Sequence, residues 1–246
     1  MEVSKKIVYI KDWILNYVNS MPKKAETLVI GISGGIDSSV SSTLCAMTGI
    51  KTIALSMPIK QKVNQHDLSL KHQKWLKDKF KNVEGYTISL DELFNSFKTS
   101  LSKFDNDHGM ANSRARLRMT TLYQVAAANN GIVVGTGNKI EDFGVGFYTK
   151  YGDGGVDISP IADCNKSEVW ELGKELNILS EIIEASPTDG LWDDGRTDVN
   201  QLGMSYQELE EAMKNSSNKN HKKYLEIRKR NLHKMNPIPV CKMKDE

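Results

Sequence analysis

The chain lacks the cysteine pattern of a disulfide-rich or zinc-binding protein. Its 246 residues include three cysteines, Cys45, Cys164 and Cys241, which are far apart and form no C-x-x-C motif. This spacing disfavours a disulfide framework or a zinc ribbon and is typical of a protein from a reducing cytosol. The five histidines form no metal-binding pattern either, so we expect most of them to be solvated at the surface.

Long apolar runs and a strong net charge are also missing. No stretch approaches the ~20 apolar residues that a membrane-spanning helix needs, and residues 1–20 alternate charged and apolar side chains instead of forming a signal-peptide core. We therefore expect a soluble, cytoplasmic protein that does not contact a membrane. The 33 basic and 31 acidic residues nearly cancel, which gives no argument for a nucleic-acid partner.

Short apolar runs and helical periodicity alternate along the chain. The apolar runs predict buried strands at residues 28–32, 51–58, 83–88 and 131–135. Helical spacing predicts helices at residues 1–20, 64–80, 90–104, 113–130, 166–177 and 206–214, with one more through Val40 and Leu44. This order predicts an α/β fold, a doubly wound parallel sheet flanked by helices, in a single domain of residues 1–246.

The ligand site of such a sheet lies beyond the carboxyl ends of its strands. The turns after Ile32, Leu55 and Val134 are therefore candidate walls of a site. Residues 188–202 show little periodicity and predict a mobile loop, whereas the basic residues between 218 and 234 indicate a solvated helix face.

A glycine-rich turn directly follows the first predicted strand. Residues 33–39 are Ser-Gly-Gly-Ile-Asp-Ser-Ser and lead into the first helical periodicity. Gly34 and Gly35 let the backbone approach a ligand closely, and the free N–H groups at the start of a helix attract phosphate. The turn therefore predicts nucleotide binding.

The lysine of a Walker motif is absent from this turn, and Asp37 stands where that cation would be. A carboxylate beside a triphosphate is repelled unless a divalent cation lies between them. Asp37 is thus a candidate Mg²⁺ ligand. The alternative is that Asp37 only caps the helix at the end of an ordinary turn.

The pattern S-G-G-x-D-S resembles the PP-loop of the N-type ATP pyrophosphatases, which cleave ATP between its α and β phosphates. Other segments are similar to motifs of one branch of that superfamily, the ammonia-dependent NAD synthetases. Residues 112–119 resemble N-x-x-A-R-x-R-M, residues 135–141 resemble G-T-x-x-x-x-E, and residues 147–157 resemble F-x-T-K-Y-G-D-G-x-x-D. Residues 165–166, 186–188 and 233–237 follow in the family's order, so the resemblance covers most of the chain.

The resemblance implies a Rossmann-like fold of the adenine nucleotide alpha hydrolase type and a set of functional residues. The residues implied to bind ATP are Gly31, Ile32, Ser33, Gly34, Gly35, Ile36, Asp37, Ser38, Met57, Thr136, Lys166 and Thr188. Those implied to bind deamido-NAD are Arg116, Lys150, Asp157, His233 and Lys234. Asp37 and Glu141 would hold Mg²⁺, and Asp37, Glu141, Lys166 and Asp157 would take part in catalysis.

Several of these residues also have a plainer interpretation. Glu141 fits a magnesium site because Mg²⁺ takes one or two carboxylates, yet it would equally serve as a solvated loop acid. Thr136 is also typical of a strand end, and Lys166 of a helix start. Asp157 would accept hydrogen bonds from ribose or receive ammonia, and the neighbouring Asp153 is as typical of a turn as of a direct role.

The sequence departs from the family pattern at two places. Ile36 stands where many members have glutamine, which should be tolerated because the phosphate contacts come mainly from the backbone. The segment between Glu141 and Lys150 is one residue longer than usual, and this leaves the geometry of residues 143–146 open.

The implied reaction joins ammonia to deamido-NAD. ATP is the co-substrate and Mg²⁺ the cofactor; adenylation of the nicotinate carboxylate precedes attack by ammonia, and NAD, AMP and pyrophosphate are released. The glutamine-using branch has a large amidase domain for which we expect no room here, and family members are homodimers. The alternatives are another PP-loop adenylating synthetase, of the GMP synthetase or tRNA-modifying kind, and a nucleotide-binding regulator without turnover.

Overall fold

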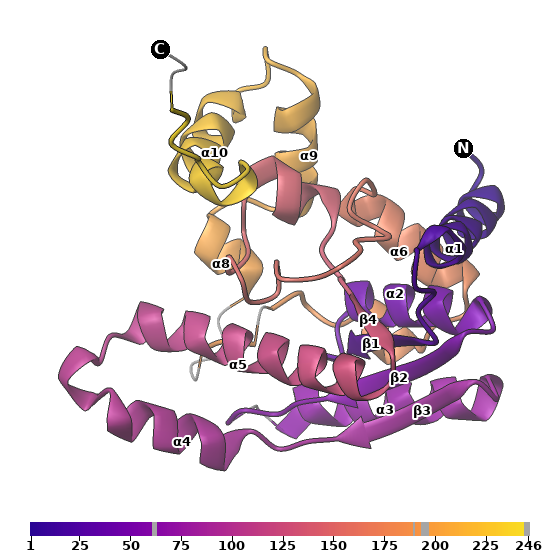
Figure 1. The fold of residues 1–246 in the computed structure, drawn as a ribbon. Coiled ribbons are helices and arrows are strands. Elements are labelled where there is room, and N and C mark those ends of the chain that lie inside the picture. The colour runs from indigo at the N-terminus through magenta and orange to yellow at the C-terminus, as the bar shows by residue number, and fades with distance from the viewer. Residues whose placement is uncertain (61–62, 189, 193–196, 244–246) are drawn as a thin grey trace.

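The computed structural model describes residues 1–60, 63–188, 190–192 and 197–243, and Figure 1 shows how its elements are arranged. Within these residues, four parallel strands form one sheet in the order β3-β2-β1-β4. They are β1 (Thr27–Gly31), β2 (Lys51–Ser56), β3 (Val83–Thr87) and β4 (Gly131–Val134). All four predicted strands are confirmed, and their carboxyl ends lie at one edge of the sheet because the strands are parallel.

Helices cover both faces of the sheet. Leu28 and Ile30 of β1 pack in an apolar cluster with α1 (Val3–Ser20), α2 (Ile36–Met47), α3 (Val63–Lys79) and α6 (Lys166–Glu175). Val29, which points to the opposite face, packs in a second cluster with α4 (Asp91–Ser100) and α5 (Asp107–Ala128). The prediction of a doubly wound parallel sheet flanked by helices is confirmed.

A third apolar cluster lies in the C-terminal part of the chain. It joins a π-helical turn, η2 (Ile140–Val145), to α8 (Asp198–Leu202), α9 (Tyr206–Lys214) and α10 (His221–Met235), and Figure 1 shows α9 and α10 standing apart from the sheet. Trp170 of α6 packs against both this cluster and the first one. This contact favours one domain over residues 1–246, which stays a prediction.

Two helix boundaries differ from the prediction by more than two residues. The helix expected from residue 113 begins at Asp107, because the side chain of Asn106 accepts a hydrogen bond from the backbone N–H of Gly109 at 2.9 Å and caps it. The helix expected over 90–104 ends at Ser100, where Leu101 leaves helical geometry, and a short 3₁₀ turn, η1 (Ser102–Phe104), follows. The helix predicted over 206–214 is confirmed with the same ends, and a short α7 (Ser180–Ile183) was not predicted.

The prediction of a loop over residues 188–202 is wrong for residues 198–202. Residues 198–202 form α8, because Thr197 and Asn200 cap it reciprocally and Gly203 closes it in the left-handed conformation, with φ of 66°. Residues 189 and 193–196 of the predicted loop lie outside the described part.

His72 is an exception to the expected surface histidines. Its ring is fully buried between α2 and α3, lies 3.0 Å from the hydroxyl of Ser42 and stacks on Trp75. Burial lowers the pKa of His72 to about 4, so the ring is neutral at pH 7. His108 and His233 are exposed, as predicted.

The π-helical turn η2 overlaps the segment between Glu141 and Lys150, where we expect one residue more than in the family pattern, an expectation that stays a prediction. A π-helix closes its hydrogen bonds over five residues instead of four, so it takes an extra residue without displacing the segments around it. Gly146 ends the turn with φ of 67°, and a Cβ atom there would lie 2.7 Å from Cβ of Asn231. Among the described residues, every helix is too short or too polar to span a bilayer.

Candidate functional site

The glycine-rich turn joins β1 to α2 at the carboxyl edge of the sheet. Gly34 has φ of 89°, which favours glycine, and Gly35 precedes the first residue of α2. The side chains of Ser33 and Ser38 lie 3.0 Å apart, and the hydroxyl of Ser38 also donates to the carbonyl of Gly35. These bonds hold the turn in a shape that directs the start of α2 at the site, as phosphate binding requires.

Three charged side chains meet beside this turn. The ammonium of Lys166, at the start of α6, donates to Asp37 Oδ2 at 2.6 Å and to Glu141 Oε1 at 3.0 Å. The Lys166 side chain is 2% exposed and each carboxylate is 17% exposed, so the contacts are largely shielded from water. Together Asp37, Lys166 and Glu141 form what we call the charged triad.

Asn138 contacts both acidic residues of the charged triad. Its amide donates to Asp37 Oδ1 at 3.0 Å, and its carbonyl accepts from the backbone N–H groups of Ile140 and Glu141. One fully buried side chain thus ties the turn after β4 to the turn after β1.

Tyr206 touches the charged triad from α9. Its hydroxyl lies 2.5 Å from Glu141 Oε1 and 2.8 Å from Asp198 Oδ2. Since a phenol carries one proton, Tyr206 donates to only one carboxylate at a time, and the other contact needs a proton from a carboxyl group. The ammonium of Lys166 lies 4.6 Å from the centre of the Tyr206 ring, within the range of a cation–π contact.

Burial and charge act in opposite directions on the charged triad. Burial raises the pKa of Asp37 and outweighs the attraction of the Lys166 ammonium. Burial also acts to raise the pKa of Glu141, but the charge of Lys166 and the hydrogen bond from Tyr206 hold it below its ordinary value. Although burial opposes the charged form of Lys166, the two carboxylates raise its pKa, so the lysine stays an ammonium.

A cavity of about 300 Å³ lies over the turn and the charged triad. One part of its wall is apolar and includes Met57, Leu68, Met119 and Leu122. A flat aromatic base would bury its faces there, while the turn and Lys166 supply positive charge and N–H donors at the other end. The cavity therefore suits an adenine nucleotide.

All twelve residues predicted to bind ATP line this one cavity. They are Gly31, Ile32, Ser33, Gly34, Gly35, Ile36, Asp37, Ser38, Met57, Thr136, Lys166 and Thr188. Glu141 lines it as well, and the three strand-end turns predicted as its walls all contribute. The structure thus brings the predicted set together; the role of each residue stays a prediction.

Four of the five residues predicted to bind deamido-NAD gather outside that cavity. Arg116 donates to the carbonyl of Lys150 at 3.4 Å, and the Lys150 ammonium lies 3.3 Å from the carbonyl of His233. The ammonium of Lys234 donates to the carbonyl of Tyr148 at 2.7 Å. The cluster is cationic, which suits the phosphates of a nucleotide.

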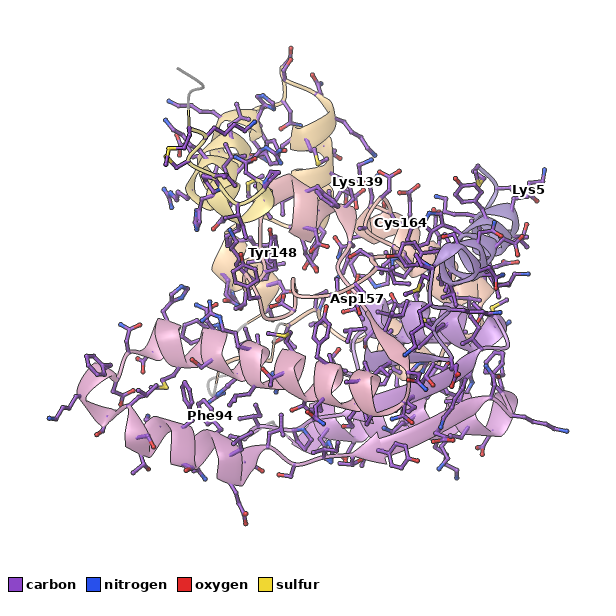
Figure 2. All side chains as sticks on the ribbon, viewed as in Figure 1. Lys5, Phe94, Lys139, Tyr148, Asp157 and Cys164 are labelled. Carbon is purple, nitrogen blue, oxygen red and sulfur yellow. The ribbon has the colours of Figure 1, made fainter. Side chains whose placement is uncertain are left out.

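Asp157 lies apart from these residues. It accepts hydrogen bonds from the hydroxyl of Tyr123 at 3.1 Å and from the backbone N–H of Val133 at 2.7 Å. Figure 2 shows it nearer the sheet than Tyr148, which lies beneath the C-terminal helices. Asp157 does not line the cavity, and its predicted roles in catalysis and binding stay predictions.

The three arginines of α5 point in different directions, because alternate residues of a helix lie on different sides. Arg114 is buried, and its guanidinium lies 4.9 Å from the centre of the Phe94 ring of α4. Arg118 donates to the carbonyl of Met57 at 3.0 Å, whereas Arg116 is exposed. Only Arg116 belongs to the cationic cluster.

Asp37 and Glu141 fit a magnesium site by the chemistry of their donors. Both supply hard carboxylate oxygens within one cavity, and Mg²⁺ takes few protein ligands when phosphate oxygens complete its shell. Among the described residues, no group of three or more histidine, cysteine, aspartate and glutamate side chains forms a metal site by itself. A cation here would therefore depend on a bound phosphate.

The sequence did not point to four polar residues of the site, namely Asn138, Asp142, Asp198 and Tyr206. Asn138 lies within the motif that ends at Glu141 and Asp142 directly follows that motif, so this segment of the sequence carried a signal for both. Burial, followed by the charge of Glu141, raises the pKa of Asp142 to about 8. Asp198 and Tyr206 are far from the motif in the sequence and had no local signal.

Comparison with known proteins places this site in a family. Residues 6–245 match the family model described as NAD synthase. The NH(3)-dependent NAD(+) synthetase of Methanosarcina acetivorans is 37% identical over 82% of this chain and 79% of its own length.

Solved structures agree with that match. An NMN synthetase from Francisella tularensis is 33% identical, covers 99% of this chain and 100% of its own, and superimposes with a TM-score of 0.91. An NH3-dependent NAD synthetase from Campylobacter jejuni is 25% identical, covers 98% and 100% of the two chains, and gives a TM-score of 0.79. The chain belongs to the NAD synthase family.

Proposed function

We propose that this chain is an ammonia-dependent NAD synthetase, a ligase that converts deamido-NAD, ATP and ammonia into NAD, AMP and pyrophosphate. One observation carries the proposal: in a member of the NAD synthase family, all residues implied to bind ATP line one cavity with the charged triad. The cavity lies beyond the carboxyl ends of β1 and β4, where the strand order of the sheet reverses.

The proposed reaction has two steps. The nicotinate carboxylate attacks the α-phosphorus of ATP, the bond to the β-phosphate oxygen breaks, and pyrophosphate leaves. Ammonia then attacks the carbonyl carbon of the acyl adenylate, AMP leaves with the electron pair of the C–O bond, and the nitrogen loses its extra proton. Because no bond to the protein forms, the work of the chain is positioning and stabilisation of charge.

The residues of the site have distinct tasks in this scheme. The turn at 33–38 and the start of α2 bind the phosphates that leave, and Lys166 offsets the charge that develops on them. Asp37 and Glu141 would hold Mg²⁺, which supplies positive charge between the carboxylates and the polyphosphate. Thr136 and Thr188 lie on the cavity wall as hydrogen-bond partners for the nucleotide.

The cationic cluster of Arg116, Lys150, His233 and Lys234 is the proposed site for the other substrate. Arg116 and His233 are exposed and Lys150 and Lys234 are half-buried, so the cluster lies at the surface, where a nucleotide phosphate can reach it. We propose a homodimer on the family resemblance, and a cytoplasmic location on the reduced state expected for the three cysteines.

A second candidate substrate is nicotinate mononucleotide, whose amidation gives NMN. It is favoured by the NMN synthetase from Francisella tularensis, which matches nearly the whole of both chains. Both acceptors carry the same nicotinate carboxylate, which would be adenylated in the same way. They differ because deamido-NAD has an adenylyl group attached to its 5′-phosphate and nicotinate mononucleotide does not.

One assay separates these proposals. The purified chain is incubated with ATP, Mg²⁺ and ammonium, and with deamido-NAD or nicotinate mononucleotide as acceptor, while NAD, NMN, AMP and pyrophosphate are measured. NAD formation with the higher kcat/KM supports the first proposal, preferential NMN formation supports the second, and absence of both products overturns them. Glutamine in place of ammonium tests the nitrogen donor.

The same assay tests the metal ligands. Asp37→Ala and Glu141→Ala should each abolish turnover with either acceptor, because each removes one of the two carboxylates proposed to hold Mg²⁺. Wild-type rates in both variants would remove the metal assignment.

A further inference from the structure

Tyr206 contacts Glu141, the residue of the charged triad that lies on the π-helical turn η2. Its hydroxyl is 2.5 Å from Glu141 Oε1, and its side chain is 4% exposed. The ring is fixed by a perpendicular contact with Trp170, whose ring centre is 6.3 Å away. Tyr206 is also the first residue of α9, which Ser205 and Glu208 cap reciprocally. Neither the side chain nor its backbone therefore has freedom to turn away from Glu141.

The contact with Tyr206 makes the two carboxylate oxygens of Glu141 unequal. Oε1 lies within hydrogen-bond distance of both the Tyr206 hydroxyl and the Lys166 ammonium. In the described part of the chain, the bonds from Lys166 and Tyr206 both fall on Oε1, Asn138 also interacts with the carboxylate, and Glu141 lines the nucleotide cavity. Since an oxygen already bound to two donors has little capacity for a cation, Oε2 is the atom left for one.

Tyr206 reaches Lys166 as well. The Lys166 ammonium lies 4.6 Å from the centre of the Tyr206 ring. The Tyr206 side chain therefore contacts Glu141 through its hydroxyl and Lys166 through the face of its ring. Its second hydroxyl contact, to Asp198, leads to the opposite wall of the cavity, because the backbone N–H of Asp198 donates to the carbonyl of Pro187 at 3.2 Å. Pro187 precedes Thr188, which is implied to bind ATP.

We propose that Tyr206 is a positioning residue, which fixes Glu141 through Oε1 so that Oε2 receives the cation that accompanies ATP. The inference rests on the proposed ATP site but not on the identity of the acceptor. It predicts that loss of the Tyr206 hydroxyl weakens cation-dependent binding of ATP and that this effect passes through Glu141.

The test compares Tyr206→Phe with Tyr224→Phe. Tyr224 is a buried tyrosine of the same C-terminal cluster, so its variant controls for the removal of a buried hydroxyl. Binding of ATP is measured by calorimetry at 10–15 °C over a series of Mg²⁺ concentrations, without any acceptor. A low temperature keeps both variants folded, and the comparison does not need turnover.

We expect Tyr206→Phe to raise the Mg²⁺ concentration for half-maximal ATP binding by roughly tenfold, the effect of losing one hydrogen bond to a charged group. Tyr224→Phe should leave it unchanged. In the Glu141→Gln background, Tyr206→Phe should add less than roughly twofold, because the two substitutions then remove one and the same interaction.

Two results would overturn the inference. One is a Tyr206→Phe protein whose Mg²⁺ dependence equals that of the wild type. The other is an equal loss from Tyr206→Phe in the wild-type and Glu141→Gln backgrounds, since that would mean that Tyr206 acts independently of Glu141. If the wild type binds Mg²⁺ and ATP but amidates neither acceptor, the proposed function fails while this inference stands.

Discussion

At the residue scale, Lys166 explains how two acids share a largely buried site. Asp37 and Glu141 would repel each other without the ammonium between them, and burial would then favour their protonated forms. Lys166 therefore has two roles. Its ammonium offsets the negative charge of Asp37 and Glu141 when no ligand is bound, and it lies where a polyphosphate needs a positive charge. This balance should be visible in stability as well as in turnover.

Lys166→Met should destabilise the protein by about 3 kcal/mol at pH 7, because breaking a buried ion pair leaves its partners uncompensated. Added Mg²⁺ should restore part of that loss in the variant and change the wild type less, since the cation takes the place of the ammonium. Urea unfolding with and without Mg²⁺ measures both effects. Lys174→Met, at an exposed position of the same helix, is the control. A variant as stable as the wild type would contradict the assigned role.

His72 predicts a pH dependence of stability. Its pKa is about 4 in the folded protein and ordinarily 6.5, so the unfolded chain binds more protons between these values. The free energy of unfolding should therefore fall as the pH falls from 6.5 towards 4. Between pH 7 and pH 5, His72 should lower the free energy of unfolding by about 2 kcal/mol.

Urea unfolding at pH 7 and pH 5 measures this share. His72→Gln should reduce the difference in unfolding free energy between the two pH values, whereas His108→Gln, at an exposed position, should not. An unchanged difference in His72→Gln would show that other groups cause the acid sensitivity.

At the element scale, α6 lies directly behind the start of α2. A Cβ atom on Gly173 would lie 2.6 Å from Cδ1 of Ile36, whose backbone begins the helix that points at the phosphates. Close approach of the two helices therefore depends on a glycine, at a position where helix propensity alone would favour alanine.

Gly173→Ala should cost about 1–2 kcal/mol of stability through overpacking, despite the gain in helix propensity, and should weaken ATP binding. Ile36→Val removes Cδ1, so the double variant should be more stable than the sum of the two single effects allows. Chemical unfolding of all four proteins gives this coupling. Gly109→Ala, where the new Cβ meets no atom closer than 3.5 Å, controls for propensity. Additive effects would refute the packing argument.

The elements themselves were largely predictable because their apolar periodicity is a local property. The helix predicted at the N-terminus and the ends of α9 are confirmed, whereas the start of α5 depends on the Asn106 cap and lies six residues before the predicted start. The ATP residues were predictable through the motifs that contain them. Tyr206 and Asp198 were not, since only folding of the C-terminal part brings them to Glu141.

At the scale of the whole molecule, ATP joins parts of the chain that the sequence separates. The cavity is lined by the turns after β1 and β4, by α5, by α6 and by residues 185–188, so a nucleotide there contacts all of them at once. A ligand that binds only the folded state stabilises every element that its site requires.

Mg²⁺ with ATP at about 100 times the dissociation constant should stabilise the protein by about 2.7 kcal/mol, which corresponds to an increase in Tm of roughly 5–10 °C. ATP with a chelator, or Mg²⁺ alone, should give a much smaller shift, because the cavity needs both charges together. Differential scanning calorimetry checks this. Equal shifts with and without the metal would argue against a cation between Asp37, Glu141 and the phosphates.

The acidic residues that line the cavity affect which charged ligands enter it. The acidic lining residues are Asp37, Glu141, Asp142, Asp153 and Asp198, and the basic ones in the described part are Lys166 and Arg118, so the field of the cavity favours cations. Such a field should oppose the entry of metal-free ATP, which is strongly negative, and attract ammonium ions. We therefore expect excess free ATP to be a poor competitor of its magnesium complex.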